Sequence, residues 1–233
     1  MIGAVLMPLV LSATPVAPEL MERLAAHDQR MQEVEARTAV VVSSEVEEMD
    51  KDYQAVGKFA STVRVQVVDG RRHARVLRAS KDGKDVTDEE QQKAAKKETE
   101  RGKEGKGSKL ESPFGASERG KYAFDNLGPE PGSSLWRIAY GPKDEPSTEV
   151  WIGEALVDPL AGELRSLFGR LSKLPTMVDS MSMQISYDAT FEGTRMPSKI
   201  TFAGEGGFLL VKKRVRGTTV LSYQPKDGSK QPP

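Results

Sequence analysis

The side chains that could do chemistry are few and lie far apart in this chain of 233 residues. Its two histidines, His27 and His73, fall on different segments. Neither has a second histidine three or four residues away, as a metal site on one element would need. Cysteine is absent, which excludes disulfides, thiolate nucleophiles and sulfur-ligated zinc. We therefore expect both histidines at the surface, and we expect neither a metal nor a cofactor.

The acidic pairs and the glycine clusters also lack a catalytic pattern. Glu47 and Glu48, like the acidic run 88–90, stand among polar residues, so nothing beside them would raise a carboxyl pKa for general acid work. The glycines within 102–107 lack the Gly-Lys-Ser/Thr ending of a phosphate-binding loop, and 204–207 reads as a hairpin turn. A Gly-x-Ser-x-Gly elbow is absent as well. These observations favour a protein that is not an enzyme.

The charge balance argues against nucleic acid as a partner. The chain has 34 basic and 34 acidic side chains, which gives a formal net charge of +0. Proteins that bind nucleic acid usually carry a basic excess, because phosphate contacts supply much of their affinity. With 37% hydrophobic and 29% charged residues, most of the chain has the composition of an ordinary globular domain.

The periodicity of the apolar residues predicts one N-terminal helix followed by many strands. Apolar residues recur at helical spacing between 18 and 35, whereas apolar and polar residues alternate from 58 to 68, as in a half-buried strand. The Asp-Gly pair at 69–70 predicts a tight hairpin. Strands in such number, with few helices between them, indicate an antiparallel sheet. The other expected strands are 38–46, 71–79, 134–140, 148–158, 163–171, 180–191, 198–204, 208–214 and 218–223.

The two ends of the chain differ from the rest. Residues 1–17 begin with an uncharged apolar run typical of a signal peptide, with Ala13 and Ala17 as candidate cleavage points. A buried N-terminal helix or strand is the alternative. We expect residues 18–225 to form a single domain and residues 226–233 a disordered tail.

Residues 81–110 interrupt the strands with a charged segment that has almost no large apolar side chain. Such a segment buries too little apolar surface to offset the entropy lost on ordering, so we expect a solvated, flexible insertion. Thr87 and Glu90 match a capping box, which predicts that a short exposed helix begins there. A segment that docks on a partner is the alternative.

The strands carry more apolar side chains than the few helices could cover. Trp136 and Ile138 share one face of their strand, and Met181, Met183 and Ile185 share one face of another. Such a sheet must curl into a barrel, pair with a second sheet or bind an apolar ligand. The two methionines either pack in the core or line a site for a variable apolar ligand. The candidate lining residues are Val63, Val65, Val67, Trp136, Ile138, Ile152, Met181, Met183 and Ile185.

The C-terminal two fifths of the chain resembles the LolA-like family, the periplasmic carriers and sorting proteins of outer-membrane lipoproteins. The match is carried by residues 151–159 (WIGEALVDP) with Gly162, by Leu174-Pro175 and the strand around Ile185, and by Gly193, Met196-Pro197 and Ile200. A looser match of helix and paired strands extends the resemblance to about residues 19–223.

This resemblance implies a mainly β fold, a curved antiparallel sheet that forms an unclosed barrel of about eleven strands under an N-terminal helix and short helices. It implies a periplasmic protein that holds a lipid or a lipoprotein acyl chain, with inner- and outer-membrane lipoprotein-transport proteins as partners. Arg64 and Arg75 are the candidates for the family's gating arginine. The main alternative is an envelope sensor or scaffold domain of the same fold that binds a protein. A hydrolase with scattered catalytic residues is a third.

Overall fold

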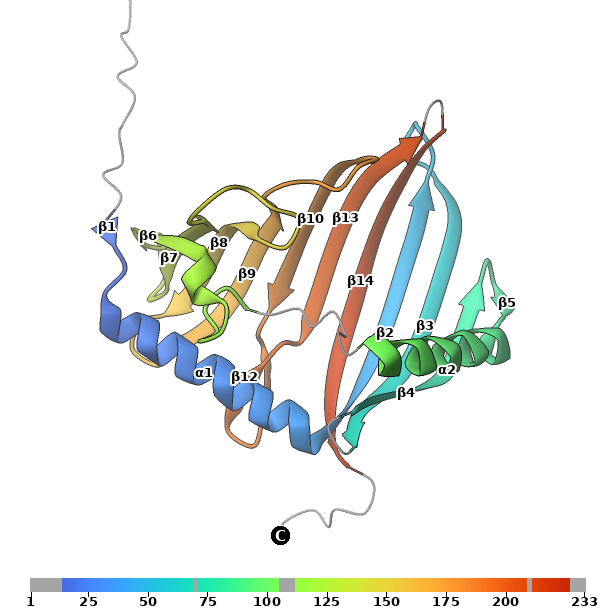
Figure 1. Ribbon diagram of the computed structural model, residues 1–233, viewed down its shortest axis with the longest axis horizontal. Coiled ribbons are helices and arrows are strands. Elements are labelled where there is room, and N and C mark those ends of the chain that lie inside the picture. The colour runs from blue at the N-terminus through green and yellow to red at the C-terminus, as the bar shows by residue number, and fades with distance from the viewer. Residues whose placement is uncertain (1–13, 69–70, 105–111, 209–210, 227–233) are drawn as a thin grey trace, which may run out of the picture.

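The computed structural model describes residues 14–68, 71–104, 112–208 and 211–226, and its described part is built mainly of β-strands (Figure 1). Two helices precede or interrupt the strands, α1 (Pro18–Arg37) and α2 (Thr87–Glu104), and a short 3-10 helix covers Arg119–Lys121. The first strands are β1 (Thr14–Pro15), β2 (Thr38–Met49), β3 (Ala55–Val68), β4 (Arg71–Lys81) and β5 (Lys84–Asp85). After α2 follow β6 (Tyr122–Pro129), β7 (Trp136–Pro142), β8 (Trp151–Asp158), β9 (Glu163–Leu171), β10 (Val178–Ser186), β11 (Ala189–Phe191), β12 (Thr194–Met196), β13 (Lys199–Phe208) and β14 (Val211–Pro225).

Twelve of these strands form one antiparallel sheet in the order β1-β6-β7-β8-β9-β10-β13-β14-β2-β3-β4-β5, and β11 and β12 form a separate hairpin. The two outer strands, β1 and β5, do not pair with each other, so the sheet stays open. The mainly β, unclosed antiparallel fold expected from the sequence is therefore confirmed, with one strand more in the sheet than the resemblance implies.

Helix α1 covers one side of this sheet (Figure 1). It begins with Pro18, whose fixed φ suits a first helical position, and its buried stripe includes Leu20, Leu24, Met31 and Val34. We call the side that α1 covers the front face and the opposite side the back face. Helix α2 lies on the front side too, next to β4 (Figure 1).

The hydrophobic core lies between α1 and the front face of β6 to β10. Leu24 and Val34 of the helix are fully enclosed, as are Ile138 and Leu164 of the sheet. Phe114, from the segment that precedes β6, also has no exposed surface and stacks near Phe124 at 5.1 Å between ring centroids. Residues 112–118 thus fold under α1, although the sequence indicates no element there.

The last long strand differs from the prediction. Strands expected at 208–214 and 218–223 are one continuous strand, β14, which runs through Gly217. Gly217 faces Phe202 across the ladder, and the ring occupies the place where a Cβ would lie. The glycine that looked like a turn therefore makes room for an aromatic side chain. The expected hairpin turn at 204–207 is likewise inside β13, and the Asp-Gly turn at 69–70 lies outside the described residues.

Most of the charged segment 81–110 is helical. Helix α2 begins at Thr87, as the capping pattern predicts, but it extends to Glu104 and packs along β4. Gln91 Oε1 accepts a hydrogen bond from the Val76 N–H at 2.7 Å, and Thr87 Oγ1 accepts one from the Ala79 N–H at 2.9 Å. Side chains of α2 thus bind backbone groups of β4, which a hydrophobicity pattern does not reveal.

The N-terminal segment enters the fold before α1 begins. Thr14 and Pro15 pair with Asn126 and Asp125 of β6, and Val16 is buried in the core. A cleavage after Ala17 would remove these contacts, whereas a cleavage after Ala13 would keep them. The apolar run 1–13 and the tail 227–233 lie outside the described residues.

Candidate functional site

The register of the sheet assigns each side chain to a face. Residues directly opposite each other in an antiparallel ladder point to the same side. Ile185 of the core pairs with Ile200, and the same row continues through Thr219, Ser44 and Ser61 to Ala79. The front face therefore runs without interruption from the core beneath α1 to β4 beside α2.

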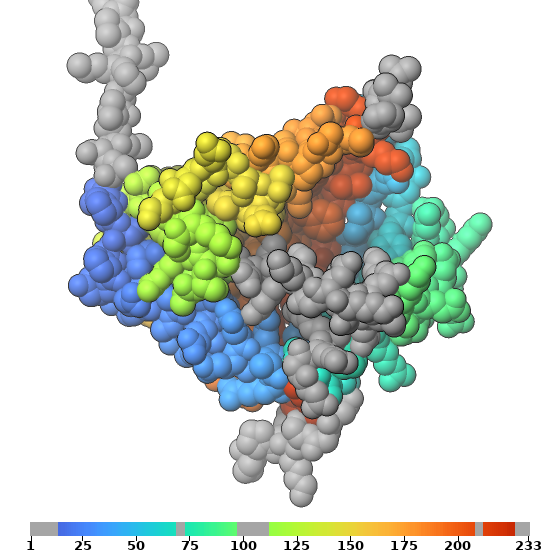
Figure 2. Space-filling view, viewed as in Figure 1, coloured from blue at the N-terminus to red at the C-terminus, as the bar shows by residue number. Residues whose placement is uncertain are grey.

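Beyond the core, the front face carries a group of apolar side chains beside the polar row of Thr219, Ser44 and Ser61. Val42 of β2 lies opposite Val63 of β3, and Val40 lies opposite Val65. Leu221 of β14 lies on the other side of Val42. All five side chains are half-buried and none belongs to the core cluster, in contrast to the enclosed residues beneath α1. Figure 2 shows the front face recessed over β13 and β14.

Eight of the nine predicted lining residues lie on the front face. Val63, Val65 and Val67 alternate along β3 toward this side, and Met181, Met183 and Ile185 do so along β10. Met181 and Met183 are half-buried, but Ile185 is part of the core with 3% of its surface exposed.

Trp136 and Ile138 of β7 also face the front, but they sit under α1. Ile138 has no exposed surface and Trp136 packs against the core cluster. Of the front-face set, Ile138 and Ile185 are therefore part of the core, and the half-buried Met183 packs against it. The valines of β3 and Met181 are half-buried outside the core cluster.

Ile152 does not join this group. In β8 the residues that face the front are Trp151, Gly153 and Ala155, so Ile152 points to the back face, where 37% of its surface is exposed. Two consecutive strand residues point to opposite faces, and here Trp151 is the one that packs against the core. Arg64 and Arg75, the candidates for a gating arginine, lie opposite each other in the ladder between β3 and β4. Both are on the back face, away from α1.

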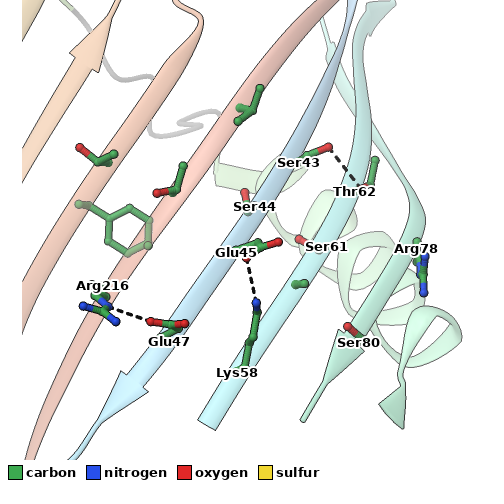
Figure 3. A pocket seen from close by; sticks show the side chains of 16 residues that line it. Ser43, Ser44, Glu45, Glu47, Lys58, Ser61, Thr62, Arg78, Ser80 and Arg216 are labelled. Carbon is green, nitrogen blue, oxygen red and sulfur yellow. Dashed lines mark hydrogen bonds and ion pairs between the residues drawn. The ribbon is translucent and has the colours of Figure 1, made fainter. Parts of the chain in front are cut away.

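A groove of about 990 Å³ crosses the back face of β13, β14, β2, β3 and β4 (Figure 3). Its floor has small side chains such as Ser43, Ala60 and Thr218. Four of its five charged side chains form two ion pairs. Glu45 binds Lys58 at 3.0 Å, and Glu47 binds Arg216 at 2.8 Å. The groove thus combines small side chains with paired charges.

A smaller groove of about 490 Å³ lies on the back face of β6 to β9. Ile152 and Phe168 project into it beside Ala139 and Gly141. Phe168 has 48% of its surface exposed, which is unusual for so large an apolar side chain. This groove offers an apolar contact to a partner.

His27 also lies elsewhere than its residue type predicts. It was expected at the surface, yet it has no exposed surface, because it lies between α1 and the sheet. Burial lowers its pKa from the ordinary value, although a hydrogen bond to the backbone of Arg195 opposes the shift. The sequence contains a signal for this burial, because His27 falls on the apolar stripe of α1. Alternating spacings of four and three residues link Leu20, Leu24, His27, Met31 and Val34.

Among the described residues, no group of three or more His, Cys, Asp or Glu side chains could hold a metal ion. Burial raises the pKa of Tyr140 and of Tyr187, so both phenols stay protonated. Within the same residues, neither helix combines the length and the apolar character that a membrane span requires.

The comparisons with known proteins find similar folds but no match in sequence. No family model and no curated protein matches the chain. A solved structure of a DUF1329 family protein from Desulfovibrio piger is 8% identical, covers 90% of this chain and 95% of its own, and has a TM-score of 0.43. LolA superfamily protein NE2245 from Nitrosomonas europaea is 9% identical, with coverages of 92% and 95% and a TM-score of 0.41.

A structure of the Pseudomonas aeruginosa MucA/MucB complex is also returned, with 10% identity, coverages of 90% and 99%, and a TM-score of 0.23. Similarities of this size do not indicate that the proteins share a function.

Proposed function

We propose that this chain is an exported, periplasmic binding protein that holds a lipid, or the acyl chain of a lipoprotein, on the front face of its sheet. The observation that carries this proposal is the apolar surface of β14, β2 and β3, which continues the core but is only half covered. In this proposal the protein takes part in sorting outer-membrane lipoproteins, with transport proteins of the inner and outer membranes as its partners, and it is not an enzyme.

The physical basis is the burial of apolar surface. Half-buried side chains such as Val42, Val63 and Leu221 leave apolar surface in contact with water. A ligand that covers it gains about 25 cal/mol for each Å² before the costs of ordering are subtracted. Met181 and Met183 stand at the other side of this face, where flexible side chains can adapt to chains of different length. The front face thus favours a long apolar ligand over a polar one.

The experiment that tests this proposal is native mass spectrometry of the protein purified from its own envelope fraction, followed by lipid extraction of anything bound. A stoichiometric acylated species would support it. A ligand-free mass that stays unchanged after incubation with lipids and acylated peptides would overturn it.

Binding of a protein partner is the second candidate function, and the exposed groove around Ile152 and Phe168 favours it. A photo-crosslinker at position 168 tests this candidate, with one at Thr218 on the same back face as the control. Capture of one defined protein from position 168 alone would support a sensor or scaffold role. Equal capture from both positions would contradict it.

A further inference from the structure

His27 joins α1 to two separate parts of the sheet. Its Nε2 lies 3.0 Å from the carbonyl oxygen of Arg195 in β12, and its Nδ1 lies 3.5 Å from the backbone nitrogen of Leu164 in β9. A carbonyl needs a donor and an N–H needs an acceptor, so only the neutral tautomer with its proton on Nε2 satisfies both groups. The imidazole therefore acts as donor and acceptor at the same time.

A second proton would disrupt this arrangement. Protonated Nδ1 would present an N–H to the N–H of Leu164, and a full charge would be enclosed where the side chain has no exposed surface. The charged groups around it are Arg30 on α1, Arg195 on β12 and Glu163 on β9. The two arginines oppose a further positive charge.

The carboxylates near His27 do not offset that charge. Glu163 is held by Arg195 at 3.1 Å and by Arg165 at 4.0 Å. Asp28, the next residue of α1, is buried and accepts a hydrogen bond from Gln32 at 2.7 Å. The burial of the ring outweighs the attraction of Glu163, so the docked helix favours the neutral imidazole.

We propose that His27 is a pH-sensitive latch, which holds α1 on β9 and β12 when its imidazole is neutral and releases the helix when it is protonated. Since α1 covers one end of the front face, release would widen access to that face. This consequence for a cargo rests on the proposed function, whereas the latch itself works without a ligand.

Linkage gives the direction and the size of the effect. A histidine freed from the core has an ordinary pKa of about 6.5, and the docked one lies lower, so acid favours the undocked helix. Between pH 7.5 and 5.5 the undocking equilibrium of α1 should increase by up to about tenfold. The effect is absent above the ordinary pKa, where both states hold neutral histidine.

Hydrogen exchange of the α1 amides, measured by mass spectrometry on the ligand-free chain and corrected for intrinsic rates, tests the latch. The wild-type helix should lose up to about tenfold protection between pH 7.5 and 5.5. His27→Gln keeps an amide donor for the Arg195 carbonyl but does not titrate, so its protection should be equal at both pH values. His73→Gln, which changes the exposed second histidine, should behave as the wild type.

Two results would overturn the latch: wild-type protection that does not change with pH, or an equal loss in His27→Gln. Should His27→Gln fail to fold, imidazole ¹⁵N NMR of the wild type replaces it. A ring that protonates near pH 6.5 while the α1 amide signals stay in place would then contradict the proposal. Because no lipid is present in either experiment, failure of the latch is distinct from failure of the proposed lipid binding.

Discussion

The ring of Phe202 lies over Gly217, so that a Cβ added to the glycine would stand 2.3 Å from the ring Cζ and 2.6 Å from Cε1. The two residues are direct partners in the ladder between β13 and β14. The glycine is thus what allows an aromatic side chain to lie flat across the front face, next to the half-buried surface of the proposed site.

Gly217→Ala should destabilise the protein by about 1–3 kcal/mol, because the added methyl group forces the Phe202 ring or the strand to move. Urea unfolding measures this loss. Gly204→Ala is the matched control on β13, since its Cβ would meet the Ser180 carbonyl at 3.4 Å and Val215 at 3.8 Å, which are ordinary contacts. Equal stability of the two variants would show that Phe202 leaves this position freely.

Val63→Asn should weaken the binding of a fluorescent fatty acid by about tenfold or more, because an unpaired amide against an acyl chain costs about 1–3 kcal/mol. Val63 lies on the half-buried front face. Val220→Asn makes the same exchange on the back face, where 46% of the side chain is exposed. An equal loss of affinity in both variants would contradict a front-face site.

A chain without residues 1–17 should have a free energy of unfolding about 2 kcal/mol lower than a chain without residues 1–13. The longer deletion takes Val16 out of the core and removes the Ala17 carbonyl, which accepts hydrogen bonds from Leu20 and Met21. Urea unfolding of both truncated chains measures this difference in the free energy of unfolding. Two equal curves would show that Val16 contributes little.

The stability of the whole chain should fall as the pH drops from 7.5 to 5.5. The pKa of His27 is lowered in the folded state, so the unfolded chain binds more protons in this window. The stability that the neutral ring contributes is present above its ordinary pKa and is lost as the pH falls, by up to about 1.4 kcal/mol over this range. Urea midpoints of the wild type should shift accordingly.

His27→Gln isolates this contribution, since its curve should be flatter than that of the wild type over the same interval. His73 is the other histidine of the chain and is exposed, so His73→Gln should preserve the wild-type slope. Loss of the pH dependence in His73→Gln would show that His73, and not His27, causes it.

Local pattern was enough to predict much of the fold. The spacing of apolar residues located α1 almost to its ends, and alternation located most strands of the sheet. These patterns work because each element buries one face, and they record its period. The register of the sheet brings Val63 and Met183 to one common face, although β3 and β10 are far apart in the sequence.

What the pattern could not supply depends on contacts between distant segments. Trp151 and Ile152 are both apolar, and only the packed core decides which of them turns inward. His27 reads as polar by residue type, although two backbone groups satisfy both of its nitrogens. Gly217 reads as a turn until the ring of Phe202 is seen above it. Each error comes from a tertiary partner that lies elsewhere in the chain.

The bonds that α2 makes to β4 have a consequence for how copies of the chain behave together. The edge of a wide open sheet is a template on which a second copy could pair, and so lead to aggregation. The short outer strand β5 pairs only with Ser80 and Lys81, so the rest of β4 lies at this edge. Gln91 and Thr87 occupy the Val76 and Ala79 N–H groups of that strand. The charged segment that breaks the run of strands therefore shields this stretch of β4 against self-association, so the fold can stay open without closing into a complete barrel.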